Sequence, residues 1–89
     1  MDRIARGRPA AGGPEELLLY NPARPLTGRY QDVLVRETAT GAVFTAPARV
    51  AADGTTVLRI GGGRKTVRVP PGDPAFEVVG VVTGTLVDP

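Results

Sequence analysis

The sequence predicts an all-β protein, a small twisted barrel or sandwich of five to six strands with an extended N-terminal arm. Short runs rich in β-branched residues recur at intervals of about 10 residues, with turn signals between them. Valine is abundant, and no window shows the periodicity of an amphipathic helix. The 89 residues suffice for one domain.

Residues 1–14 are predicted to form the arm, and residues 15–89 the single β domain. The arm carries Arg3, Arg6 and Arg8, followed by a stretch rich in glycine and proline, and it offers little apolar surface to a core. Two interpretations stay open for it. The arm either hangs free of the domain or becomes ordered on a partner protein or on nucleic acid.

The expected strands are runs of alternating or continuous apolar residues bounded by turn residues. Asp53-Gly54 is a strong hairpin signal between two of them. Pro47 cannot donate a hydrogen bond to a neighbouring strand, so its strand should lie at an edge or carry a bulge. The expected strands are residues 17–20, 32–37, 42–50, 55–60, 66–69 and 76–87.

The last of these strands, residues 76–87, is apolar on both of its faces. Such a strand either lies centrally in a closed barrel, or has one face that another chain covers. Under the second interpretation, period-2 alternation defines a candidate interface face. Its members are Val79, Val81, Thr83, Thr85 and Val87.

Several kinds of chemistry are excluded by residue types that the sequence lacks. It contains no cysteine, histidine or serine, which removes the usual nucleophiles, the usual general base and the commonest metal ligands. Residues 61–66 look like a phosphate-binding loop, but Arg64 stands where that motif needs glycine, and a strand follows instead of a helix. We expect a non-enzymatic protein with no cofactor, no metal and no small-molecule substrate.

The positive charge of the chain is small and comes mostly from arginine. The net charge is +2, and Lys65 is the only lysine among eleven basic residues. Arginine suits carboxylate and phosphate contacts, but with few aromatic residues to stack on bases, nucleic-acid binding should be weak and salt-dependent. The candidate contacts to an anion or partner are Arg3, Arg6, Arg8, Arg64 and Lys65.

No apolar stretch approaches the roughly 18 residues of a membrane-spanning helix, so no membrane partner is expected. We expect the protein in the cytoplasm, or in a particle assembled there.

Several of these segments resemble the successive strands of the LexA-like (S24) self-cleavage domain. The nearest match is residues 76–84, FEVVGVVTG, and the resemblance extends back to residue 15. That family uses a serine nucleophile and a lysine base, which would fall just before Leu17 and near residues 44–46, where this chain has neither. The resemblance therefore implies a catalytically inactive scaffold that pairs through its C-terminal strands.

These observations together predict a protein–protein assembly module, homo-oligomeric and without enzymatic activity. One alternative is a structural protein of a virus-like particle, such as a capsid decoration or joining protein. Another alternative is a nucleic-acid-binding β-barrel, which would gather its arginines on one face.

Overall fold

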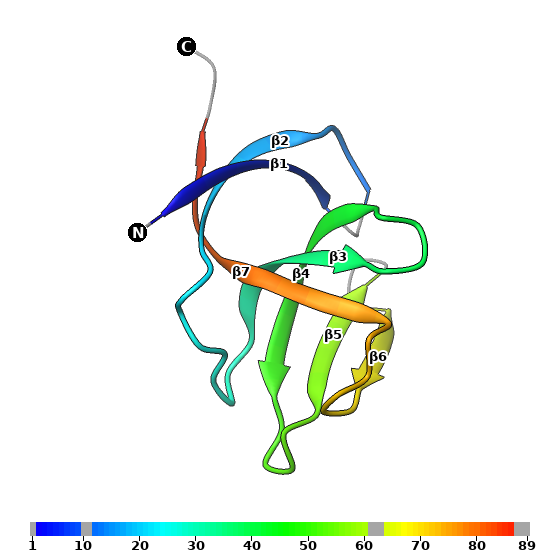
Figure 1. Cartoon of the computed structure of the whole chain (residues 1–89). Helices are drawn as coiled ribbons and strands as arrows, with labels where there is room; N and C mark the ends of the chain where they lie inside the picture. Colours follow the sequence, from blue (N-terminus) through cyan, green and yellow to red (C-terminus); the bar gives the residue numbers. More distant parts are fainter. Residues whose placement is uncertain (1, 10–11, 61–63, 87–89) are drawn as a thin grey trace.

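The computed structural model describes residues 2–9, 12–60 and 64–86. In it, seven strands form one sheet in the order β1-β2-β7-β3-β4-β5-β6 (Figure 1). The predicted all-β class is confirmed. In the described part of the chain no helix is long and apolar enough to cross a membrane. The strands are β1 (Arg3–Pro9), β2 (Glu16–Asn21), β3 (Gln31–Glu37), β4 (Val43–Val50), β5 (Thr56–Ile60), β6 (Lys65–Val69) and β7 (Phe76–Leu86).

The sheet coils so far that its first strand meets a strand from its middle. β1 pairs antiparallel with β2 and also parallel with β4, through Arg8 opposite Phe44 and Pro9 opposite Thr45. The strands β1, β2, β7, β3 and β4 thereby close into a ring, and β5 and β6 continue outward from β4 (Figure 1). The radius of gyration is 12.4 Å, close to the roughly 12 Å expected for a compact chain of this length.

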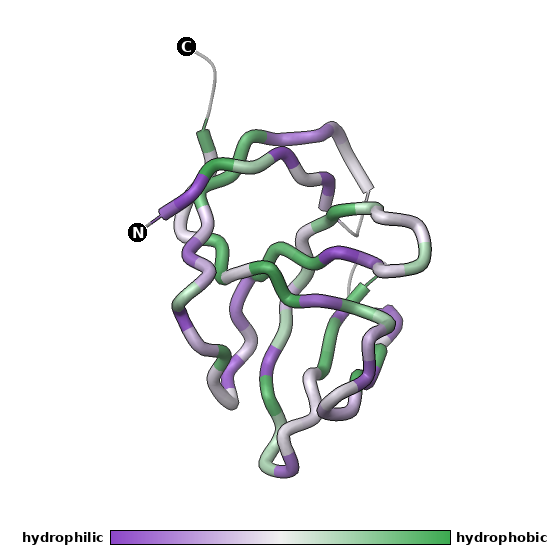
Figure 2. Tube along the Cα trace, in the orientation of Figure 1, coloured by the Kyte–Doolittle hydropathy of each residue, from purple (hydrophilic) through white to green (hydrophobic). Residues whose placement is uncertain are grey.

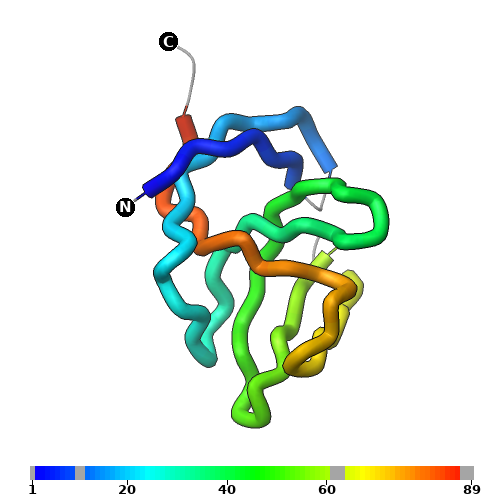
Figure 3. The backbone as a smooth tube through the Cα atoms, viewed as in Figure 1, coloured from blue at the N-terminus to red at the C-terminus, as the bar shows by residue number. Residues whose placement is uncertain are grey.

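The segment expected as an arm is extended, but residues 3–9 of it form β1 and belong to the sheet. This raises the number of strands above the expected five to six. Gly7 explains how β1 fits, because a Cβ atom at this position would lie 3.0 Å from Cδ1 of both Leu18 and Leu34. Figure 3 shows the start of β1 beside the end of β7, where the Thr83 hydroxyl donates a 2.8 Å hydrogen bond to Asp2.

The main hydrophobic core lies on one face of β3, β4 and β7 and is shared with β5 and β6. Phe44 and Phe76 pack against it and meet edge to face, with ring centroids 6.3 Å apart. Burying one aliphatic side chain contributes about 1.5–3 kcal/mol, so this cluster is the chief stabilising element of the fold. Its buried members are Val33, Val35, Ala48, Leu58, Val69 and Val81.

A second, smaller core fills the inside of the ring. Leu18 and Leu34 are both buried there, and the Cδ1 atom of each lies close to Gly7. Because β3 has a core on each face, the consecutive residues Val33, Leu34 and Val35 are all buried.

The strand β7 is central, since it pairs with β2 on one side and with β3 on the other. Its apolar residues run through the middle of the molecule (Figure 2). The first of the two interpretations of residues 76–87, a central strand, therefore agrees with the sheet order.

Two bulges interrupt the alternation of β7. Opposite β3 the register passes from Gly80 directly to Val78, which leaves Val79 without a partner. Opposite β2 it passes from Gly84 directly to Val82, which leaves Thr83 without one. Each bulge adds a residue and reverses which side chains face each way beyond it, so the two faces assigned from strict alternation are not those of the folded strand.

Pro47 does not make β4 an edge strand, since β4 lies between β3 and β5. On the side away from β3, however, β1 pairs only with Phe44 and Thr45, and β5 pairs only from Ala48 onward. Pro47 falls in the interval between these two stretches, where a missing N–H group is tolerated.

Candidate functional site: an open strand edge beside a core-facing pocket

The five residues of the predicted interface do not share one exposed face, so that prediction is wrong in this form. Val81 is only 2% exposed and belongs to the main core. Val79 is half-buried on the ring side, while Thr83 and Thr85 are exposed. The physical reason is the bulge at Val79, which turns Val81 to the opposite side of β7. Val87 lies outside the described residues.

The five predicted cation contacts lie on two separate strands. Arg3, Arg6 and Arg8 are exposed on β1, whereas Lys65 begins β6 and Arg64 precedes it. β1 and β6 stand at opposite ends of the strand order, so these charges form two groups and no single patch. Charged residues on open edges also discourage accidental pairing with other chains, and that role alone explains part of this placement.

The mouth of the ring holds a concavity of about 290 Å³, to which all five of its strands contribute. Its rim carries the ion pair between Arg36 and Glu77. These two charges neutralise each other and their side chains are about half exposed, so the pair itself gives the mouth little electrostatic selectivity. The remaining lining residues are Ala5, Arg6, Tyr20, Leu34, Val43 and Val79.

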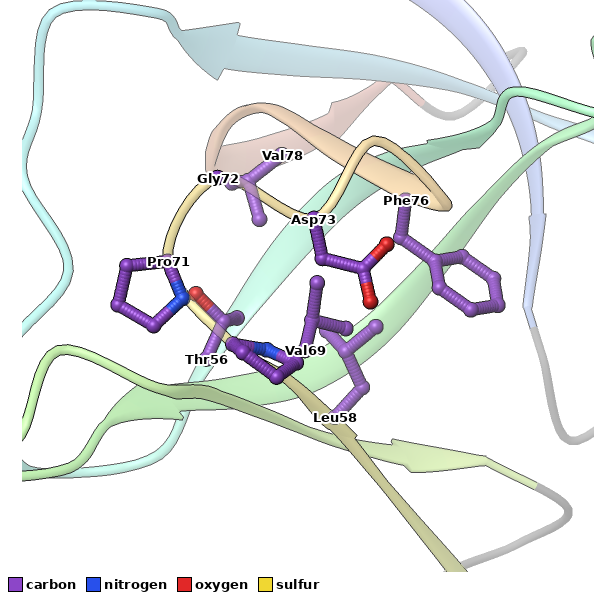
Figure 4. Close-up of a pocket in the computed structure, with 9 residues that line it drawn as sticks. Thr56, Leu58, Val69, Pro71, Gly72, Asp73, Phe76 and Val78 are labelled. Carbon is purple, nitrogen blue, oxygen red and sulfur yellow. The ribbon is translucent and has the colours of Figure 1, made fainter.

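A second pocket, of about 200 Å³, opens between β5, β6, the loop that follows β6 and the start of β7 (Figure 4). Its floor includes Leu58 and Val69, which are members of the main core. The pocket therefore leads from the surface to the core. The other lining residues are Thr56, Pro70, Pro71, Gly72, Asp73, Phe76 and Val78.

The loop over this pocket is fixed by its own hydrogen bonds. The Asp73 N–H group donates to the Pro70 carbonyl at 3.1 Å, and Gly72 has a φ of 83°, as the third residue of a type II turn requires. One oxygen of Asp73 accepts a 2.9 Å hydrogen bond from the Ala75 N–H group. In Figure 4 the Asp73 carboxylate points into the space among the apolar side chains, so the pocket has a carboxylate in addition to the Thr56 hydroxyl of its lining.

The strand β6 borders this pocket and has an open edge. Within the described residues β6 pairs with β5 alone. Lys65 and Val67 lie on the same face of β6 as Val69, whose side chain reaches the pocket. The site therefore combines unpaired backbone groups, an apolar hollow and a positive charge at Lys65, which is the arrangement used to bind an extended peptide segment.

A further group, which sequence reasoning missed, lies on the opposite face of β4, β5 and β6. We call Tyr30, Arg49, Arg59 and Arg68 the arginine–tyrosine face. Val57 on β5 is the cross-strand partner of Arg49 on β4 and of Arg68 on β6, so all three side chains lie on one face of the sheet. The alternation of arginine with apolar residues in three successive strands was the available signal, but it needed the register of the hairpins.

Comparison of the chain with protein-family models, curated proteins and solved structures finds no match. The resemblance to the LexA-like domain stays a prediction, and the candidate sites rest on geometry and charge.

Proposed function

We propose that this protein is a non-enzymatic assembly module that binds an extended, acidic segment of a different protein along β6. The observation that carries the proposal is the open edge of β6 beside a pocket that reaches two core residues, Leu58 and Val69. A bound segment would continue the sheet through backbone hydrogen bonds and place one apolar side chain in the pocket.

The pocket has the size for such a side chain. Its volume of about 200 Å³ accommodates a valine or leucine, whose burial contributes about 1.5–3 kcal/mol. Backbone hydrogen bonds along β6 would add to this, while the ordering of the segment would subtract from it. The expected binding is therefore moderate in strength and depends on both the edge and the pocket.

The charges on the open edges favour a different protein over a second copy of this chain. Two β6 strands in full antiparallel register would make Arg68 of one chain a diagonal neighbour of Arg64 and Arg68 of the other. On β1, Arg3 and Arg6 precede the stretch that pairs with β4, and they have the same sign of charge. Like charges opposite each other destabilise strand pairing, whereas acidic residues on a partner would stabilise it.

The non-enzymatic part of the proposal rests on the residue types of the sequence. The chain has no serine, cysteine or histidine, and Lys65 does not match the position of the lysine base in the LexA-like family. We place the function in the cytoplasm, or in a particle assembled there, where an assembly module would meet its partner.

The proposal can be tested by selecting binders from a displayed library of random peptides against the full-length chain. We expect the selected peptides to be acidic and to alternate apolar with polar residues. A representative peptide should protect backbone amides of β6 from hydrogen exchange and leave those of β1 unprotected. Lys65→Glu should lower the affinity for this peptide about tenfold or more, because it reverses the charge on the pocket side of the β6 edge.

The matched control is Arg3→Glu, which makes the same change of net charge on the other open edge. It should alter the affinity of the peptide by less than about twofold, the effect of net charge alone. Failure to select any binder, selection of basic peptides, or equal losses in the two variants would each refute the proposal.

A further inference from the structure

Two arginine side chains share one tyrosine ring on the arginine–tyrosine face. The Cζ atoms of Arg59 and Arg49 lie 4.5 and 5.6 Å from the centroid of Tyr30. Both distances are within the range of cation–π attraction, which fixes the two guanidinium groups near the ring. Tyr30 as a residue keeps 38% of its surface exposed, so solvent still reaches it beside the two guanidinium groups.

Among the residues that the structure describes, these guanidinium groups have no carboxylate partner. Within the described residues the ion pair between Arg36 and Glu77 is the one salt bridge, and the side chains of Arg49, Arg59 and Arg68 donate no hydrogen bond. The groups of Arg49 and Arg59 lie within about 10 Å of each other, given their distances to the ring. An anion between them would relieve their mutual repulsion and accept their unused N–H groups.

The positive charge extends beyond this pair along the same face. Arg68 stands opposite Val57 on the side away from Arg49, so the arginines span β4, β5 and β6. Two acidic residues lie nearby. Asp32 shares the face because it stands opposite Pro47, and Asp53 feels the charge of Arg68. Arginine still exceeds acid on this face, and its charges are spread over three strands instead of converging on one point.

We propose that the arginine–tyrosine face binds the phosphate backbone of a single-stranded nucleic acid, with a base stacked on Tyr30. Planar guanidinium groups bind phosphate oxygens in pairs, and an exposed aromatic ring offers a stacking surface to any base. A nucleic acid uses both features together, whereas an acidic peptide would use only the charges. This binding is separate from the proposed peptide site, which lies on the other face of β5 and β6.

The test is fluorescence anisotropy with a labelled single-stranded DNA of mixed sequence and about 20 nucleotides, at about 50 mM salt. The double variant Arg49→Gln/Arg59→Gln should lose about tenfold or more in affinity. It should reduce the slope of log affinity against log salt concentration by about 1.4, since each phosphate contact to a single strand contributes about 0.7. Tyr30→Ala should lose about fivefold, while Tyr30→Phe should bind like the wild type, because it keeps the ring. The same sequence as a duplex should bind more weakly.

The matched control is Arg3→Gln/Arg6→Gln, which removes the same net charge from β1 and should cost less than about twofold. If the double variant on the face does not fold, Arg68→Gln, at an exposed position, should still lower the salt slope by about 0.7. Equal losses in face and control variants, undetectable binding of the wild type, or displacement of the DNA by polyglutamate at equal charge would overturn the proposal.

Discussion

The close approach of β2 and β7 at Gly80 predicts a specific loss of stability on replacement of this glycine by alanine. An added Cβ atom would lie 2.7 Å from Cδ2 of Tyr20 and 2.9 Å from both the carbonyl carbon and the oxygen of Asn21. The ring of Tyr20 can turn aside, but the Asn21 backbone is held in β2. The two strands would have to separate by about 0.5 Å to restore ordinary contact, a form of overpacking that costs about 1–3 kcal/mol.

Gly84→Ala is the matched control on the same strand. A Cβ atom there would meet only Cδ1 of Leu19 at 3.6 Å, an ordinary contact distance. Both substitutions lower the entropy of the unfolded chain to the same extent, a gain of about 0.4–1 kcal/mol. The difference between the two variants therefore isolates the steric cost, and we expect Gly80→Ala to be less stable than Gly84→Ala by about 2 kcal/mol.

Urea denaturation followed by circular dichroism measures this difference. With a slope of about 1 kcal/mol per molar urea, the midpoint of Gly80→Ala should lie about 2 M below that of Gly84→Ala. The slope itself should stay constant between the variants, since the strands remain paired. Equal midpoints would refute the reasoning, because they would mean that β2 and β7 do not approach each other closely at Gly80.

Two further predictions concern the main core and the turn before β5. Val81→Glu should leave the chain unfolded by circular dichroism, because an unpaired carboxylate in the core costs several kcal/mol. The control Thr85→Glu, at an exposed position, should stay folded. A folded Val81→Glu chain would contradict the burial of Val81. Hydrogen bonds from the Thr55 backbone and hydroxyl, helped by the charge of Arg68, hold the pKa of Asp53 below its ordinary value of 3.8. The stabilisation from Asp53 is thus present above about pH 4 and lost as the pH falls through the lowered pKa. The difference in urea midpoint between the wild type and Asp53→Ala should therefore become smaller below about pH 4. A difference that stays constant with pH would contradict this.

Most strands could be predicted because their signals are local. Each of the six expected segments contains a strand, with ends that shift by one residue or less, and the Asp53-Gly54 turn joins β4 to β5. The strand β1 could not be predicted in this way. Its arginines, Gly7 and Pro9 are typical of a loose arm, and its place in the sheet depends on Leu18 and Leu34, which come later in the chain.

The candidate sites were harder to predict because they depend on which strands become neighbours. The pocket beside β6 joins Leu58, Val69 and Phe76 from three separate segments. The arginine–tyrosine face needs the register that sets Arg49 and Arg68 on either side of Val57. Period-2 alternation assigns the two faces of one strand, but it gives neither the partner of that strand nor the position of a bulge.

The bulge at Val79 explains both why β7 is apolar on two sides and why Val79 and Val81 do not share one face. It places Val79 and Gly80 consecutively toward the ring, so that Val78 and Val81 both reach the main core. One strand thus supplies side chains to one core and a glycine to the close packing of the other. Val78 and Val81 serve the main core within the chain, while Thr83 and Thr85, further along the same strand, are exposed. The open edge of β6 and the arginine–tyrosine face are the surfaces that carry the two proposals, and β6 contributes to both proposed sites.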